Sequence, residues 1–212
     1  MRPWYRFCRD LVYWLARGLW GLRVDGLDKL PRDGAAVVAS NHRSLLDPPL
    51  LGSVLPRESG FVAKRELFSV PGLSTLIRSL NAIPIERGRL SMEKMDELAE
   101  FLDGGKLLLY FPEGTRSRNG KLGRAKAGIG VLLTKRAVPV VPAFVQGTES
   151  PVRNLFRRGR LRIVFGDPQT IPGDAGPEEP RERARWIAEA VLARIRELGE
   201  VSAENGRAGR KL

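Results

Sequence analysis

The stretch of sequence that decides the fold lies at residues 36–48 and reads AVVASNHRSLLDP. Its first four residues are apolar and two of them are β-branched, which predicts a buried strand that ends at Ser40. Pro48 suits the first turn of a helix, so a helix is expected to follow Asp47 and to run to about Leu55. A strand, a short polar loop and a helix in this order are typical of an α/β domain.

The same alternation of strands and helices continues along the chain. Short apolar runs predict further strands at residues 61–63, 82–85, 107–111, 139–145 and 162–165. Apolar residues at helical spacing predict helices at residues 72–80, 91–102, 124–136 and 180–198. We therefore expect an α/β layered domain with a mixed, largely parallel central sheet that is flanked by helices.

The first 23 residues predict an amphipathic helix that precedes the sheet. Its apolar side chains recur at spacings of three and four, and most of its five arginines lie on other faces. One interpretation is a helix packed on the domain core. The other is a membrane-associating helix, with aromatic rings at headgroup depth and arginines on lipid phosphate. Three tryptophans beside five arginines in so short a segment favour the membrane.

The net charge, the apolar runs and the counts of histidine and cysteine limit which partners and which kinds of site the chain can have. The chain has 212 residues and a net charge of +12, which attracts polyanions such as nucleic acids or an anionic membrane surface. No stretch of about 18 apolar residues predicts a transmembrane helix. We expect an amphipathic helix at 1–23, one domain at 24–199 and a basic flexible tail at 200–212. His42 is the single histidine and Cys8 the single cysteine, so neither a disulfide nor a metal site is expected.

The loop after the first predicted strand holds a candidate acid–base pair. A neutral imidazole takes a proton from a hydroxyl when a carboxylate holds its other ring nitrogen. On a continuous helix, His42 and Asp47 would lie about 140° apart, at 3.6 residues per turn. They meet only if the segment bends, and Pro48 favours such a bend because it disfavours helical geometry at the residue before it. The alternative is that Asp47 caps the helix and His42 fills a surface niche.

Three further segments each combine a predicted strand with charged residues or with glycine or proline, which have unusual backbone preferences. Residues 111–117 read FPEGTRS, where Gly114 permits unusual backbone geometry and Arg116 is well shaped for a phosphate. Residues 81–88 read NAIPIERG and run from a strand into a charged turn. Residues 138–143 read VPVVPA, in which two prolines limit ladder pairing.

Together, these four segments resemble the sequence blocks of the glycerolipid acyltransferase family. The first block has the family form Asn-His-x-Ser-x-x-Asp, and the block at 111–117 is matched in full. The order and separations also agree, and the resemblance covers roughly residues 24–170. The chain departs from the family pattern at Asn81, where glycine is usual, and at Ala143, where a larger aliphatic residue is common.

The resemblance implies that the domain at 24–199 transfers a fatty acyl group to the sn-2 hydroxyl of 1-acylglycerol-3-phosphate, giving phosphatidic acid without a cofactor or an acyl-enzyme. It implies that His42 is the general base and that Asp47 orients it. Arg87 and Arg116 would hold the substrate phosphate, and Glu113 would position the acceptor or orient Arg116. Further candidates for positioning or for the rim of the site are Ser44, Gly114, Thr115, Asn41, Lys64, Lys126 and Gly128.

The expected partners are an anionic membrane surface, a lysophospholipid and, as acyl donor, acyl-CoA or acyl carrier protein. The expected location is the cytoplasmic face of the cell membrane, as a peripheral or monotopic protein. Alternatives are another lysophospholipid or related lipid as acceptor, a hydrolase in which water replaces the lipid hydroxyl, and a basic nucleic-acid-binding protein. No nucleic acid is expected, because the aromatic residues gather at the N-terminus rather than alternating with basic ones along a strand.

Overall fold

The computed structural model describes residues 1–86, 91–117, 122–156 and 161–208, with residues 203–208 described by their backbone. A seven-stranded sheet runs through these residues in the order β1-β7-β6-β2-β5-β3-β4. The five strands from β6 to β4 are parallel, whereas β7 is antiparallel to β6 and β1 is parallel to β7. The strands are β1 (Arg23–Asp25), β2 (Ala36–Ser40), β3 (Ser59–Lys64), β4 (Ala82–Ile85), β5 (Leu107–Tyr110), β6 (Val140–Gln146) and β7 (Arg162–Phe165).

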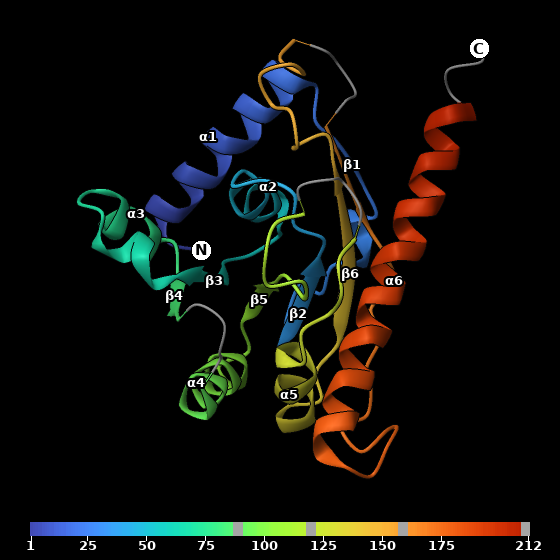
Figure 1. Cartoon of the computed structure of the whole chain (residues 1–212). Coiled ribbons are helices and arrows are strands. Elements are labelled where there is room, and N and C mark those ends of the chain that lie inside the picture. Colours follow the sequence, from blue (N-terminus) through green and yellow to red (C-terminus); the bar gives the residue numbers. More distant parts are fainter. Residues whose placement is uncertain (87–90, 118–121, 157–160, 209–212) are drawn as a thin grey trace.

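Helices cover both faces of the sheet (Figure 1), which confirms the predicted fold class. One layer contains α1 (Pro3–Trp20) and α2 (Asp47–Val54), and the other contains α4 (Met92–Asp103), α5 (Gly128–Lys135) and α6 (Pro180–Ala208). The short helix α3 (Leu73–Ser79) packs near β4, next to the 3-10 turn η2 (Arg65–Ser69), and a second such turn, η1 (Leu27–Lys29), follows β1.

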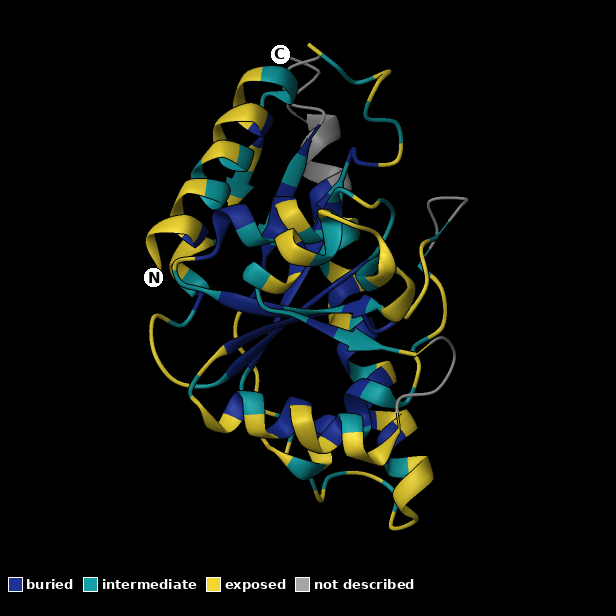
Figure 2. Cartoon of the chain, turned by 90° about the vertical axis from the view of Figure 1, so that its left-hand side faces the viewer, coloured by how far each residue is buried: buried dark blue, intermediate teal, exposed yellow. Residues whose placement is uncertain are grey.

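Alternate residues of the central strands supply the two apolar cores. Val38 and Leu109 belong to the core under α1 and α2, whereas Val37 and Leu108 belong to the core under α4, α5 and α6. This alternation follows from the period of two along a strand. Figure 2 shows the result, with buried strands between helices whose outer faces are exposed. Because both faces are covered, the strands are continuously apolar, as predicted for β2 and β5.

The start of helix α5 and the presence of strand β1 both differ from the sequence prediction. Helix α5 starts later than the predicted helix at 124–136, because the preceding backbone is bound elsewhere: Gly123 donates to Glu113, and Lys126 donates to the carbonyl of Pro112. Strand β1 was not predicted, since three residues are too few to show an alternating pattern.

Helix α6 is longer than the sequence predicts. The sequence predicts a helix at 180–198 and, because the residues after Gly199 are polar and basic, a tail at residues 200–212. The helix instead passes through Gly199. A Cβ at this position would lie 2.6 Å from the ring of Phe144, so the glycine serves close packing against β6. Residues 200–208 are helical, and the prediction of a flexible tail is wrong for them.

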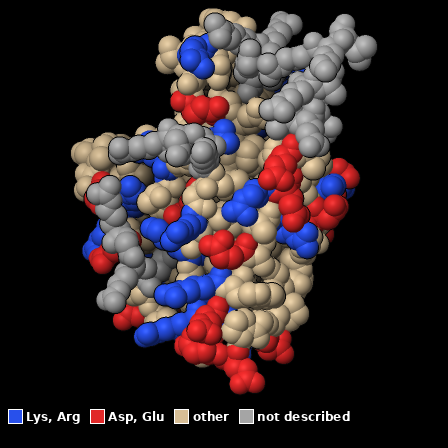
Figure 3. Space-filling model, turned by 45° about the vertical axis from the view of Figure 1, so that its right-hand side comes forward, with Lys and Arg blue, Asp and Glu red and all other residues tan. Residues whose placement is uncertain are grey.

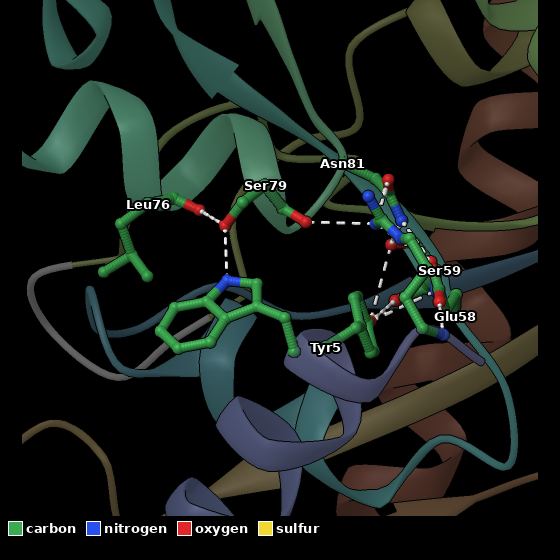
Figure 4. Close-up of polar contacts among 8 residues, drawn as sticks. Tyr5, Glu58, Ser59, Leu76, Ser79 and Asn81 are labelled. Atoms are coloured by element: carbon green, nitrogen blue, oxygen red, sulfur yellow. Dashed lines mark hydrogen bonds and ion pairs between the residues drawn. The ribbon is translucent and has the colours of Figure 1, made fainter.

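The N-terminal end of α1 is fastened to the starts of β3 and β4 by a cluster of polar contacts (Figure 4). Arg2 donates to Glu58 through its backbone nitrogen and, at 2.9 Å, through Nε. Burial alone would raise the pKa of Glu58, but hydrogen bonds from Arg2 and Asn81, with the charge of Arg2, lower that pKa overall. The hydroxyl of Tyr5 lies 3.2 Å from Oγ of Ser59 within the same cluster. These contacts join the first turn of α1 to the sheet.

The departure from the family pattern at Asn81 has a backbone explanation. Asn81 has a φ of +63°, in the left-handed region that glycine adopts freely and that asparagine tolerates better than most residues. Its side chain then gains contacts that glycine lacks. Its Oδ1 accepts from Arg2 Nη2 at 2.7 Å, and its Nδ2 donates to Glu58 at 3.3 Å. The residue therefore preserves the turn and adds an anchor for α1.

Helix α1 is apolar on two adjacent faces. Tyr5 and Ala16 are buried against the domain, and Trp20 donates its indole N–H to the carbonyl of Pro151 at 2.8 Å. At about 100° per residue, a second apolar arc lies beside the buried one. Its side chains are 47–65% exposed, and they are Trp4, Phe7, Leu11, Trp14 and Leu15. The helix was interpreted either as packed on the core or as membrane-associating. Packing on the core accounts for the buried face but not for the exposed apolar arc. In the described part of the chain, no helix is long and apolar enough to cross a membrane.

The contact between α5 and α6 gives a stability test. A Cβ on Gly130 would lie 1.8 Å from the carbonyl oxygen of Ala184, and both belong to helix backbones that cannot shift cheaply. We expect Gly130→Ala to lower the free energy of unfolding by about 1–3 kcal/mol through overpacking. Gly18→Ala is the matched control, because no atom lies within 4 Å of its added Cβ. Helix propensity should make that variant about 0.5–1 kcal/mol more stable.

Urea unfolding followed by circular dichroism measures both variants against the parent chain. Equal stability of Gly130→Ala and the parent would contradict the close approach of α5 and α6.

Candidate active site

The predicted site residues gather at one edge of the sheet. The carboxyl ends of parallel strands lie at the same edge, and in α/β sheets ligands bind there. His42 follows β2, Lys64 ends β3, and Glu113 follows β5. Strand β4 also ends at this edge, whereas Arg87 lies outside the described residues. The topology therefore brings together segments that are far apart in the sequence.

A buried carboxylate shapes the loop between β2 and α2. The fully buried Oδ2 of Asp47 accepts hydrogen bonds from the backbone N–H groups of Arg43 at 2.6 Å and Ser44 at 2.7 Å. It also accepts from Nδ1 of His42 at 2.9 Å. The segment before α2 bends as expected, but the predicted cause is wrong, because Asp47 is itself the first residue of the helix and Pro48 does not keep it out. The alternative role of Asp47 as a helix cap is wrong, because no side chain caps α2 and the carboxylate binds the loop before it.

The imidazole of His42 is held in one orientation. A carboxylate only accepts hydrogen bonds, so Nδ1 carries the proton and Nε2 is the basic nitrogen. The ring also stacks on Phe111, with centroids 4.2 Å apart and planes 27° apart. No hydrogen bond to Nε2 occurs within the described parts of the chain. The side chain remains partly exposed, at 17%.

Glu113 holds the backbone of His42. The residue is only 4% exposed. One oxygen accepts from the backbone N–H of His42 at 3.0 Å, and the other accepts from Gly123 at 2.8 Å. The backbone N–H of Ser117 donates to the carbonyl of His42 at 2.8 Å. The family resemblance implies that Glu113 positions the acceptor or orients Arg116, and no contact between Glu113 and Arg116 is found among the described residues. Glu113 instead joins the β2–α2 loop, which holds the histidine, to two parts of the β5–α5 connection.

Asn41 fixes the same loop to β6. Its side-chain amide donates to the carbonyl of Val145 at 2.9 Å and accepts from the N–H of Val145 at 2.7 Å. Asn41 and Val145 are both buried, so the side chain of Asn41 satisfies both the N–H and the carbonyl of Val145. Ser44 has a related role in the loop, since its Oγ accepts from the N–H of Leu46 at 3.3 Å.

The remaining predicted residues form a more open rim. Gly114 has a φ of +62°, which confirms the unusual backbone geometry expected there, and its N–H donates to the carbonyl of Phe111. Thr115 and Arg116 follow it on the exposed part of the loop. The aliphatic chain of Lys126 lies over Gly114, where an added Cβ would meet it at 2.9 Å. Gly128 is farther along and begins α5.

An apolar cavity of about 190 Å³ lies beside this loop, and no sequence pattern indicated its position. Helix α2 contributes Leu50 and the adjacent Leu46, which directly precedes Asp47 in the chain. The other walls come from α1 and from the connection between β6 and β7. The remaining lining residues are Val12, Leu15, Ala16, Trp20, Pro49, Gly147, Thr148, Pro151 and Leu161.

Charged residues surround the loops unevenly. Arg116, Arg124 and Lys126 are exposed near the rim. Arg43 lies over the ring of Phe144 and pairs with Glu149 at 3.7 Å. Figure 3 shows basic and acidic side chains interleaved over much of one face, so the net charge of +12 is not a uniform coat. In the ranges that the structure describes, no three His, Cys, Asp or Glu side chains are grouped so as to hold a metal ion.

Comparison with known proteins agrees with this architecture. Residues 21–146 match the model of the acyltransferase family. A 1-acyl-sn-glycerol-3-phosphate acyltransferase from Bacillus subtilis is 28% identical over 92% of this chain and 96% of its own length. One from Pseudomonas aeruginosa is 31% identical over 90% of this chain and 79% of its own length.

A solved structure is similar over nearly the whole chain. It is the 1-acyl-sn-glycerophosphate (LPA) acyltransferase PlsC from Thermotoga maritima. It superposes with a TM-score of 0.71 at 30% identity, over 94% of this chain and 78% of that one. The family model covers more than half of the sequence. The chain therefore belongs to the acyltransferase family.

Proposed function

We propose that this enzyme transfers a fatty acyl group from an acyl thioester to the sn-2 hydroxyl of 1-acylglycerol-3-phosphate, which gives phosphatidic acid. The observation that carries the proposal is the His42–Asp47 pair, 2.9 Å apart, at the sheet edge beside an apolar cavity. The relatives from Bacillus subtilis and Pseudomonas aeruginosa carry this activity in their names and support the choice of acceptor.

The chemistry needs only one base. Nε2 of His42 removes the proton of the lipid hydroxyl as its oxygen attacks the thioester carbonyl carbon. Asp47 keeps the proton on Nδ1 and stabilises the imidazolium that forms. Collapse of the tetrahedral intermediate breaks the carbon–sulfur bond, and the imidazolium returns its proton to the departing thiolate. The products are the diacyl lipid and the free thiol, and no acyl-enzyme forms.

The substrate phosphate is expected on the basic rim. Arg116 is exposed in the loop after β5, and a guanidinium suits bidentate binding of a phosphate. We assign the acceptor phosphate to Arg116 and Arg87, with Lys126 and Lys64 nearby at the same edge. The donor, acyl-CoA or acyl carrier protein, is anionic in either case, so the basic surface suits both.

A fatty acyl chain fits the apolar cavity. Its walls are mainly aliphatic, and Leu46 links it to the catalytic loop. Burial of a chain there gives a favourable hydrophobic term for binding. The second wall is α1, so the cavity lies between the catalytic layer and the helix that carries the exposed aromatic arc.

The exposed apolar arc of α1 supports contact with a membrane. Besides the side chains of α1, Val152 and Phe156 are 84% and 73% exposed on the β6–β7 connection. The N–H of Phe156 donates to the carbonyl of Leu19 at 2.7 Å, which places these residues at the end of the same helix. Asp10 is the single acid of α1, and it pairs with Arg9. Exposed aromatic residues with few free carboxylates suit an anionic lipid surface.

Substitution of the acid–base pair tests the mechanism. We expect His42→Ala to lower kcat by about 10³-fold, because the hydroxyl loses its base. Asp47→Asn should lower it by about 10²–10⁴-fold, because the preferred tautomer of His42 is lost. Asp28→Asn makes the same chemical change on an exposed carboxylate and should leave the rate unchanged.

The assay measures diacyl product and free fatty acid with both donor types and several lysolipids. Release of fatty acid without diacyl product would instead identify a thioesterase. Absence of turnover together with tight, salt-sensitive binding of RNA would overturn the enzymatic proposal.

Glu113→Gln separates two roles for this carboxylate. Glutamine keeps one acceptor oxygen but presents an NH₂ group to the other backbone N–H, so the loops around His42 lose a contact. We expect kcat to fall about 10–100-fold, with little change in KM for the acceptor, because the base is displaced rather than the lipid. Glu100→Gln on the exposed face of α4 is the control. A raised KM at unchanged kcat would show that Glu113 contacts the acceptor.

Polar substitution of the exposed face of α1 tests membrane contact. The combined variant Phe7→Ser, Leu11→Ser and Trp14→Ser should weaken binding to vesicles of phosphatidylglycerol and phosphatidylethanolamine at least about tenfold, because apolar area no longer enters the interface. Met92→Ser removes a comparable side chain, 59% exposed, from the opposite layer and should have no effect.

Substitution is preferable to deletion of residues 1–23, since Ala16 and Leu22 belong to the apolar core. Vesicle flotation gives the affinity, and thermal unfolding confirms the fold. Unchanged flotation of the combined variant would refute the contact.

A further inference from the structure

A second exposed apolar surface lies on the connection between β3 and β4. Residues 67–77 of this connection read LFSVPGLSTLI and include no charged residue, although 28% of the chain is charged. The charged residues of the connection lie at its two ends, and they are Arg65, Glu66 and Arg78. Val70 is 44% exposed and Leu76 is 41% exposed. Exposed apolar side chains that are grouped and rimmed by charges mark a surface that binds a partner.

The two apolar cores of the domain do not account for this stretch. Turn η2 and helix α3 pack on each other and on the edge strand β4. Ile77 is the single buried residue of the stretch, and it belongs to neither core. Three further apolar side chains are partly buried and also lie outside both cores, and they are Leu67, Phe68 and Leu73. Contacts within the domain therefore do not explain why Val70 and Leu76 are apolar.

The stretch adjoins the exposed apolar arc of α1. The indole N–H of Trp4 donates to Oγ of Ser79 at 2.9 Å, and that hydroxyl donates to the carbonyl of Leu76 at 2.7 Å. Figure 1 shows α3 beside the N-terminal end of α1, and Figure 4 shows Leu76 and Ser79 on the part of α3 that meets this end. Trp4 is 51% exposed and stacks on Phe7, another member of the arc. The exposed apolar surface of α1 therefore continues onto α3.

The charge at the rim of this surface suits a lipid headgroup. Arg78 is exposed, and its guanidinium lies 4.8 Å from the centre of the Phe68 ring. It pairs with no carboxylate in the part of the chain that the structure describes. An arginine beside apolar side chains places its aliphatic part over hydrocarbon and its guanidinium on phosphate. A bilayer is also the one partner wide enough to cover α1 and α3 together, whatever its local composition.

We propose that η2 and α3 form a second membrane-contacting element, in which Val70 and Leu76 enter the bilayer interface beside α1. The inference rests on the proposed membrane contact of α1 and assigns a function to a different part of the fold. A single helix that lies on a bilayer leaves the molecule free to rotate about the helix axis. A second contact away from that axis stops the rotation. Because η2 directly follows Lys64 at the carboxyl edge of the sheet, this contact also sets how that edge faces the lipid.

A dye on α3 tests the contact directly. Cys8 is the single cysteine, so Cys8→Ser removes it and Leu76→Cys then supplies one site for the environment-sensitive dye NBD. In the same background, Met92→Cys places the dye on the opposite layer, at a residue that is 59% exposed. Vesicles of phosphatidylglycerol and phosphatidylethanolamine should raise the emission of the dye at position 76 and shift it to shorter wavelength, because the dye leaves water. The dye at position 92 should not respond.

Removal of the two exposed side chains tests their contribution to affinity. The double variant Val70→Ser and Leu76→Ser should bind these vesicles about 3- to 10-fold more weakly in flotation, because less apolar area leaves water. The matched control is Val201→Ser with Met92→Ser. These two side chains are 54% and 59% exposed on helices of the opposite layer, so their loss should leave the affinity unchanged. Thermal unfolding checks that both double variants remain folded.

A dye at position 76 that stays in water while the labelled chain floats with the vesicles would overturn the inference and leave the contact of α1 intact. Equal flotation of the parent and the α3 double variant would overturn it as well. A dye response that follows protein concentration without vesicles would identify α3 as a contact between two copies of the chain and reject the membrane. Failure of the parent to float would overturn the contact of α1 and this inference together. None of these measurements needs turnover, so the acyl-transfer proposal is tested separately, by the diacyl product.

Discussion

The geometry of the site depends on one buried oxygen, Oδ2 of Asp47. It accepts three hydrogen bonds, two from the backbone of its own loop and one from His42. A carboxylate without water must be compensated by such donors, so the loop cannot open without exposing an unpaired charge to an apolar surrounding. The same contacts that stabilise the charge therefore fix the base. Folding of the loop and orientation of the imidazole are a single event.

The rest of the site extends this constraint to the sheet. Asn41 joins the loop to β6, and Glu113 joins it to the segment after β5 and to Gly123. Asn41 and Glu113 are buried side chains that form hydrogen bonds with backbone groups. They therefore satisfy backbone N–H and carbonyl groups that no neighbouring strand pairs beyond the ends of the strands. A strand edge that would otherwise be irregular becomes rigid enough to hold a base in position.

Sequence reasoning reached the fold and the acid–base pair because each has a local signal. Apolar runs and helical spacing marked most of the elements, and a resemblance in four short blocks identified the loops. The role of Glu113, the stacking of Phe111 and the cavity beside Thr148 had no such signal, because they arise from contacts between segments far apart in the chain. The end of α6 was predicted too early, because a polar and basic composition does not show that the helix continues past the contact between Gly199 and Phe144.

Helix α1 carries one apolar face into the core and leaves the next outside. A helix of this kind cannot roll or detach to meet lipid without uncovering Tyr5 and Ala16, so the molecule would approach a bilayer as a rigid body. Its substrate would then be encountered by lateral diffusion in two dimensions. The rate of such an enzyme follows the mole fraction of lysolipid in the surface, and inert lipid added at constant bulk concentration slows it by surface dilution.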